Sequence, residues 1–271
     1  MTTTATISFL GTGSGYPSGD RYFSSSLLRA GGFHLLIDTG EPCVHLLENR
    51  GSLLRDIDAV LITHGHVDHI GGLPAFLQGC MLRERTKPLP IYLPGEMIAP
   101  VRAWIEALYL TEEGLGFTLF WYPWVNGERV EIQETLSFTP KRNLHLEQCY
   151  RTLPRADRDR PCDSYSLEIV VGDFCAFFSG DLASARDLVP VLPKSSGKGV
   201  RLVSVLICEL SHFRAEELAE VLQEASIETL CLVHLSEDYA ENRSTLRLQM
   251  EELLPSIQDV LIPEDGETLD F

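Results

Sequence analysis

Four residues of the kind that bind metal ions fall within six consecutive positions of the chain. They are His64, His66, Asp68 and His69, in the run T-H-G-H-V-D-H. Imidazole nitrogen suits zinc and its neighbours in the first transition row, and carboxylate oxygen completes such a site. His64 and His66 stand two residues apart, so both can face one ion in an extended turn. The adjacent Asp68 and His69 can turn toward a second ion, and the run therefore predicts a two-metal centre.

The elements expected on either side of this cluster are a strand and a helix. The apolar run 58–62 precedes it and is typical of a buried β-strand. Gly71 and Gly72 follow it, and a helix is expected over 73–78. Glycine at these positions lets the backbone pass close behind the metal site. The cluster is thus expected at the end of a strand, where a rigid scaffold can aim its side chains.

Further apolar runs predict an α/β fold. Strands are expected over 6–10, 33–37, 59–62, 91–93, 166–171, 174–178, 203–207, 229–232 and 260–262. Several of them are continuously apolar, as in strands that are buried on both faces. Helices are expected over 43–49, 73–78, 98–110, 214–225 and 244–254, from apolar spacing and from Gly and Pro near their ends. No linker-like stretch separates these elements, so we expect a single domain over residues 1–271.

Composition and charge limit the classes of protein to which the chain can belong. Its 271 residues carry a formal net charge of −17, which disfavours extended nucleic-acid binding because that needs a basic surface. No apolar run approaches the roughly 20 residues of a membrane span, and the first residues show no signal-peptide pattern. The seven scattered cysteines contain no CxxC pair, so most of them are expected to be small core residues. We expect a cytoplasmic protein with no membrane partner.

One segment departs from the acidic balance of the chain. Residues 141–160 hold six basic side chains against three acidic ones. The basic residues are Lys141, Arg142, Arg151, Arg155, Arg158 and Arg160, and the acidic ones are Glu147, Asp157 and Asp159. The segment is either a solvated loop or a place where phosphate is held.

The run T-H-x-H-x-D-H at the end of a strand resembles the signature of the metallo-β-lactamase superfamily. The glycine-rich segment 7–15 and the L-I-D-T-G segment at 36–40 resemble the ribonuclease Z branch. The resemblance covers nearly the whole chain and implies a four-layer αβ/βα sandwich with metals at one edge between two sheets. The G-T-G-S-G run at 11–15 is expected to be a tight turn near the metals. Unlike in a dinucleotide-binding loop, Pro17 follows it and no helix pattern begins there.

The resemblance also implies the remaining metal ligands. The third histidine of the family pattern corresponds to His145, and its bridging carboxylate corresponds to Asp181. The final histidine of the pattern corresponds to His234. The implied arrangement places His64, His66 and His145 on one ion and Asp68, His69 and His234 on the other, with Asp181 between them. All are nitrogen or oxygen ligands, so two divalent ions are expected, zinc first and manganese or iron as alternatives. Histidine rather than glutamate at position 66 favours hydrolysis over redox chemistry.

The chemistry expected of such a centre is attack by a metal-bridging hydroxide, because bound ions lower the pKa of water. Asp68 is expected to hold that hydroxide by a hydrogen bond while it ligates its ion. Segment 208–215 resembles the ribonuclease Z elements that supply a proton donor, with His212 as the donor and Glu209 as its orienting partner. Cys208 replaces the histidine of the family's H-E-A-T element. An ordinary polar strand end with a helix-capping Ser211 is the alternative.

The function that these features favour is a phosphodiesterase acting on a small or nucleotide-like phosphodiester. Processing of tRNA 3′ ends is an alternative, although the long arm with which ribonuclease Z enzymes bind tRNA is not recognisable. A thioester or lactone hydrolase and a non-catalytic ligand-binding relative are further alternatives. Residues 111–127 contain a group of aromatic side chains: Phe117, Phe120, Trp121, Tyr122 and Trp124. We expect this group either to wall a substrate pocket, to form a dimer contact or to belong to a buried strand or helix edge. Similar proteins are often dimers, so a homodimer is expected by analogy.

Overall fold

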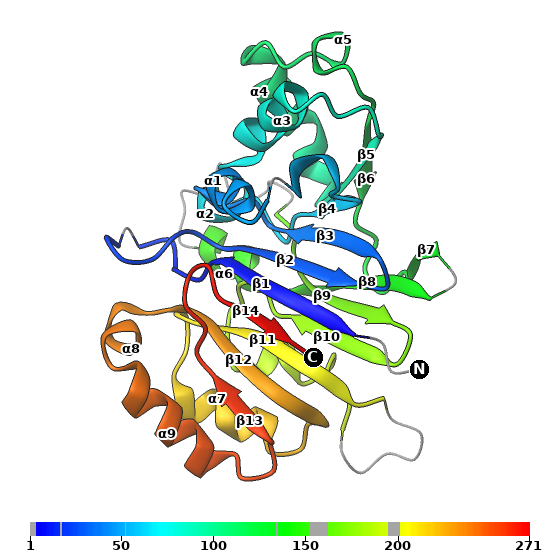
Figure 1. Cartoon of the computed structure of the whole chain (residues 1–271). Coiled ribbons are helices and arrows are strands. Elements are labelled where there is room, and N and C mark those ends of the chain that lie inside the picture. The colour runs from blue at the N-terminus through cyan, green and yellow to red at the C-terminus, as the bar shows by residue number, and fades with distance from the viewer. Residues whose placement is uncertain (1–3, 17, 52, 134, 152–161, 195–200) are drawn as a thin grey trace. The chain divides into compact units, whose positions relative to one another are not determined.

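Two units, each built around one mixed β-sheet, make up the computed structural model of the chain (Figure 1). The structure describes residues 4–16, 18–51, 53–133, 135–151, 162–194 and 201–271. The N-terminal unit consists of Ala5–Trp124 together with Glu264–Phe271, and the C-terminal unit consists of Val125–Pro263. A single domain over residues 1–271 remains a prediction.

The sheet of the N-terminal unit has the strand order β14-β1-β2-β3-β4-β5-β6. Its strands are β1 (Ala5–Gly11), β2 (Ser25–Ala30), β3 (Phe33–Ile37), β4 (Ala59–Leu61), β5 (Leu89–Leu93), β6 (Leu119–Pro123) and β14 (Thr268–Asp270). Strands β14 to β3 pair antiparallel, and β3 to β6 pair parallel. Ile37 of β3 is in register with Leu61 of β4. Both strands therefore end at the same edge of the sheet, and the polar residues that follow them lie there together.

Helices of the N-terminal unit share one core with its sheet. They are α1 (Cys43–Glu48), α2 (Val67–Ile70), α3 (Leu73–Leu82), α4 (Ile98–Ala107) and α5 (Glu112–Leu115). Leu47 of α1 and Phe76 of α3 belong to the same buried cluster as Leu36 and Ile91 of the sheet. Burying a side chain of this size contributes about 1.5–3 kcal/mol. This packing holds the strand ends and the short helix α2 in fixed positions.

The sheet of the C-terminal unit has the strand order β13-β12-β11-β10-β9-β8-β7. Its strands are β7 (Val130–Gln133), β8 (Leu136–Asn143), β9 (Ser164–Val171), β10 (Phe174–Phe178), β11 (Val203–Leu210), β12 (Ile227–Leu235) and β13 (Asp259–Leu261). Strands β7 to β10 pair antiparallel, and β10 to β13 pair parallel. The parallel strands β10, β11 and β12 again bring polar residues to one edge.

Helices of the C-terminal unit are α6 (His145–Arg151), α7 (Ala215–Leu222), α8 (Glu237–Glu241) and α9 (Arg243–Leu253). Leu218 and Leu222 of α7 and Met250 of α9 are fully buried against Leu206 and Leu230 of the sheet. Their spacing along the chain is the apolar pattern that predicted helices over 214–225 and 244–254. Both of these expected helices are present.

All nine expected strands are present, and the structure adds β2, β6, β7, β8 and β14. Strand β8 reads L-S-F-T-P-K-R-N, in which polar residues and a proline hide the apolar pattern of a strand. The aromatic group of 111–127 falls on and beside β6, the last strand in the order of its sheet. Phe117 and Trp124 are buried, whereas the side chains of Phe120 and Tyr122 are about half-exposed. The group therefore lies on and beside a terminal strand, and its role as a pocket wall or dimer contact stays a prediction.

Two further observations concern expectations from composition. No helix among the described residues has both the length and the apolar character needed to cross a bilayer. Five of the seven cysteines are buried. Burial raises the pKa of the Cys80 and Cys175 thiols to about 12, as expected of cysteines in an apolar core.

Candidate metal centre

The histidine-rich run of the N-terminal unit crosses from the end of β4 into α2. His64 is fully buried in the turn, and Asp68 and His69 are buried within α2. His66 precedes α2 and is half-buried. The ring centroid of His64 lies 4.7 Å from that of His66 and 4.1 Å from that of His69. The structure thus brings the four residues together at the carboxyl end of the sheet.

The glycine-rich turn expected near the metals lies beside this cluster. A Cβ atom added at Gly15 would lie 3.0 Å from Asp68 Oδ2. A contact of that length is tighter than most real Cβ contacts, so a side chain at position 15 would push the Asp68 carboxylate away by a few tenths of an ångström. Gly15 of the run at 11–15 therefore leaves room for the Asp68 carboxylate.

A buried carboxylate that follows β3 organises the same cluster. The Asp38 carboxylate accepts hydrogen bonds from the backbone N–H of Thr63 (2.8 Å) and from its hydroxyl. Its Oδ2 lies 2.8 Å from His69 Nδ1, and Thr63 Oγ1 lies 3.1 Å from His64 Nδ1. When Asp38 accepts the Nδ1 proton of His69, the lone pair on Nε2 is left for an ion. Asp38 holds a φ of 57°, a left-handed conformation that Asp tolerates better than most residues.

Three further ligand-type residues meet at the sheet edge of the C-terminal unit. His145 begins α6 directly after β8, Asp181 follows β10, and His234 lies in β12. All three are buried, with 1–3% of their surface exposed. Asp181 Oδ2 lies 3.6 Å from His145 Nε2, and Asp181 Oδ1 lies 3.5 Å from His234 Nε2. Each oxygen of one carboxylate thus faces a different imidazole.

These separations fit a shared cation better than they fit direct hydrogen bonds. A hydrogen bond from nitrogen to oxygen spans roughly 2.7–3.2 Å. Two ligands held at about 2.1 Å by one tetrahedral ion are about 3.4 Å apart. In the N-terminal unit His69 Nε2 likewise lies 3.5 Å from Asp68 Oδ2. The donor set of imidazole nitrogens and carboxylate oxygens therefore suits a divalent metal of the zinc kind.

Glu209 and His212 also meet in the C-terminal unit. Glu209 is 1% exposed, and its carboxylate accepts hydrogen bonds from the backbone N–H groups of Leu182 (3.0 Å) and Ser211 (2.7 Å). His212 Nδ1 lies 2.9 Å from Glu209 Oε1, and its side chain is 35% exposed. A buried carboxylate thus orients a partly exposed imidazole. This is the geometry of an acid–base pair.

Sequence reasoning missed the roles of Asp38, Thr63 and Ser211. Asp38 and Thr63 each follow a buried strand, a position that carries a weak signal of function on its own. Ser211 was interpreted only as a helix cap, but α7 begins at Ala215 and its N-cap residue is Arg214. The Ser211 hydroxyl instead lies among Glu209, His212 and His234.

The basic side chains of 141–160 that the structure describes have acidic partners within the chain. The ion pairs are Lys141 with Glu168, Arg142 with Asp163 and Glu147, and Arg151 with Glu147. The hydrogen bond from Arg142 to Asp163 raises the pKa of that guanidinium. Arg155, Asp157, Arg158, Asp159 and Arg160 lie outside the described residues. A phosphate-holding role for the described cations would have to compete with these ion pairs.

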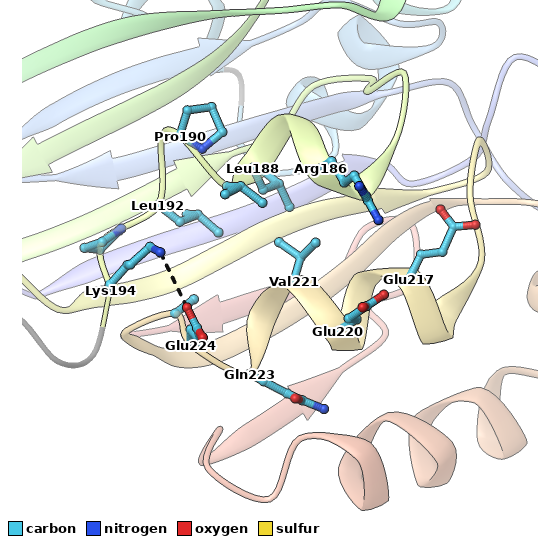
Figure 2. Close-up of a pocket in the computed structure, with 13 residues that line it drawn as sticks. Arg186, Leu188, Pro190, Leu192, Lys194, Glu217, Glu220, Val221, Gln223 and Glu224 are labelled. Atoms are coloured by element: carbon cyan, nitrogen blue, oxygen red, sulfur yellow. Dashed lines mark hydrogen bonds and ion pairs between the residues drawn. The ribbon is translucent and has the colours of Figure 1, made fainter.

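A surface groove of about 780 Å³ lies elsewhere in the C-terminal unit, between segment 186–194 and α7 (Figure 2). Glu217 and Glu220 line one side, and Lys194 pairs with Glu224 at 3.5 Å across it. None of the expected metal ligands, nor Glu209 or His212, lines this groove. The candidate chemistry is therefore not located there.

Comparisons with known proteins agree with this geometry. Ribonuclease Z of Natronomonas pharaonis is 25% identical, over 98% of this chain and 97% of its own length. Ribonuclease Z of an Exiguobacterium species is 39% identical over 42% of this chain, and that match spans 36% of the relative. The fold matches YhfI of Bacillus subtilis, a metallo-β-lactamase fold protein (TM-score 0.76, 18% identity, 99% and 100% of the two chains). It also matches the short form of human tRNase Z (TM-score 0.73, 20% identity, 97% and 98%).

The chain has the metallo-β-lactamase fold and belongs to the ribonuclease Z-like branch of that superfamily, and its two histidine- and aspartate-rich clusters are of a kind that could hold metal ions. The predicted superfamily and α/β fold class are confirmed. More narrowly, a family model described as anti-Pycsar protein Apyc1 matches residues 5–252, and the chain belongs to that family.

Proposed function

We propose that the chain is a dinuclear metal phosphodiesterase that acts on a small, nucleotide-like phosphodiester. The observation that carries the proposal is the Asp181 carboxylate, whose oxygens face His145 and His234 separately. A carboxylate in this position suits a bridge between two ions. We propose the ligand set that the family pattern implies: His64, His66 and His145 on one ion, Asp68, His69 and His234 on the other, and Asp181 on both.

Three residues of the chain position the attacking water and supply the proton in the proposed reaction. When bound, divalent ions of this kind lower the pKa of water and neutralise charge on a developing oxyanion. Asp68 holds the attacking water by a hydrogen bond. His212, oriented by the buried Glu209, gives a proton to the departing oxygen. This pair favours phosphodiesters with alkoxide leaving groups, because a departing thiolate needs a proton much less.

A second candidate is cleavage of RNA, in particular processing of tRNA 3′ ends. Relatives named ribonuclease Z favour it, and RNA backbones are themselves phosphodiesters. These names run against the expectation, from a net charge of −17, that extended nucleic-acid binding is disfavoured. A small phosphodiester fits both the ligand set and the charge, and for that reason it is the first proposal.

An activity panel on the zinc-loaded protein tests these alternatives. The substrates are bis(p-nitrophenyl) phosphate, a dinucleotide, a precursor tRNA, a thioester and a lactone. We expect the two small diesters to be hydrolysed by the wild type and not by Asp181→Asn. The control Asp259→Asn changes an exposed carboxylate of the same unit, at the start of β13, and it should keep the activity.

Each other outcome of the panel points to a different function. Cleavage of precursor tRNA but of neither small diester would favour the ribonuclease. Turnover of only the thioester or lactone would refute the phosphodiesterase. Metal binding without turnover of any substrate would favour the non-catalytic relative. A homodimer remains a prediction, which sedimentation analysis of the same preparation would check.

A further inference from the structure

The hydroxyl of Ser211 lies where three ionisable side chains meet. Ser211 follows β11, and its Oγ lies 3.2 Å from Glu209 Oε2. The same oxygen lies 3.0 Å from His212 Nδ1 and 2.9 Å from His234 Nδ1. The two imidazole rings are nearly parallel, with their centroids 5.8 Å apart. One hydroxyl therefore contacts both the acid–base pair and a proposed metal ligand.

The number of protons available fixes the direction of these hydrogen bonds. A serine hydroxyl has one hydrogen to donate and two lone pairs, and an ionised carboxylate only accepts. The Ser211 hydroxyl therefore donates to Glu209 Oε2, which cannot donate in return. The Nδ1 proton of His212 goes to Glu209 Oε1 at 2.9 Å. The remaining partner, His234 Nδ1, then donates its own proton to Ser211 Oγ.

We propose that Ser211 is a positioning residue that links Glu209 to His234. Through its hydroxyl, the negative charge of Glu209 holds the His234 proton on Nδ1 and leaves the Nε2 lone pair facing Asp181, at 3.5 Å. One buried carboxylate thus orients the proton donor His212 directly and the ligand His234 through the serine. The inference rests on the proposed function, in which His234 binds a metal ion.

The backbone conformation of His234 is strained, so the residue needs contacts that hold it in place. Its φ is 48°, in the left-handed region that residues with a Cβ seldom adopt. A strained residue of this kind persists only when its surroundings fix it. The Ser211 hydrogen bond fixes the ring of His234, so loss of the hydroxyl should affect metal binding more than it affects overall stability.

The test compares Ser211→Ala and Ser211→Thr with the wild type. Zinc affinity is measured by competition with a chromophoric chelator, and we expect Ser211→Ala to lose about 10- to 100-fold, as is usual for groups that orient metal ligands. Ser211→Thr keeps a hydroxyl and should keep the wild-type affinity. The control Ser204→Ala, in β11, removes a hydroxyl that accepts from the Cys175 backbone N–H (3.1 Å) and should not change the zinc affinity.

A second readout does not depend on activity or on a bound metal. Nuclear magnetic resonance of the metal-free wild type with ¹⁵N-labelled histidine should show the His234 proton on Nδ1, with the signal assigned by its loss in His234→Gln. A proton on Nε2 would overturn the inference, as would wild-type zinc affinity in Ser211→Ala or equal losses in the alanine and threonine variants. A wild type that binds no zinc would instead overturn the proposed function, while the proton position would still report on Ser211.

Discussion

Replacing Asp38 with asparagine removes a buried negative charge from beside His69 while keeping the shape of the side chain. In the wild type, Asp38 Oδ1 accepts from the Thr63 backbone N–H at 2.8 Å, and Oδ2 lies 2.8 Å from His69 Nδ1. The NH₂ group of asparagine cannot accept a hydrogen bond, so one of these two hydrogen bonds that the Asp38 oxygens accept is lost whichever way the amide faces. Facing Thr63, it leaves a buried N–H without an acceptor, at a cost of about 1–3 kcal/mol. Facing His69, it forces the ring proton onto Nε2 and blocks the metal-binding nitrogen.

Either arrangement should weaken zinc binding. Loss of a group that orients a metal ligand typically costs about 10- to 100-fold in affinity, equivalent to about 1.4–2.8 kcal/mol. Chelator competition measures the affinity, and chemical denaturation of the metal-free protein measures the free energy of unfolding. The control is Asp58→Asn, since Asp58 also accepts a backbone hydrogen bond, from His34 at 2.8 Å, in the same unit. An Asp38→Asn protein with wild-type zinc affinity and wild-type stability would refute the reasoning.

Three further predictions concern other parts of the chain. Gly15→Ala should weaken zinc binding about tenfold, because its Cβ would press on Asp68 Oδ2 at 3.0 Å, whereas Gly19→Ala meets nothing within 4 Å; equal affinities would contradict this. His212→Ala should slow hydrolysis of an alkyl phosphodiester by about 10²–10⁴-fold and of an aryl diester far less, and equal losses in kcat would remove His212 as the proton donor. Burial raises the pKa of Cys80 from 9.0 to about 12, so its contribution to stability is present below pH 9.0 and is lost as the pH rises toward 12. Mass spectrometry should find this thiol unlabelled by an alkylating reagent at neutral pH until the protein is denatured, and rapid labelling of the native protein would contradict its burial.

The sequence could predict the histidine-rich run because all its ligands are local. His64 to His69 stand within six positions, directly after a strand whose residues are all apolar. Ligand type, spacing and position relative to the strand are then visible without any knowledge of the tertiary fold. His145 was harder to place, because the polar residues and proline of β8 conceal the strand that positions it. Its role was expected only from the family resemblance.

The groups that orient the ligands could not be predicted, because they depend on strand register. Asp38 reaches Thr63 and His69 only because β3 and β4 pair in parallel and end at the same edge. Ser211 likewise meets His234 because β11 and β12 are neighbours. In each case the hydrogen bond joins residues more than twenty positions apart, and no local pattern marks them.

The stoichiometry of metal binding tests the central claim most directly. Metal-free wild-type protein is titrated with zinc while hydrolysis of bis(p-nitrophenyl) phosphate is followed in the same samples. The account predicts two zinc ions per chain, activity that appears as the second ion binds, and loss of both the second ion and the activity in Asp181→Asn. A single ion at saturation, or phosphodiester hydrolysis that persists in the metal-free protein, would contradict it.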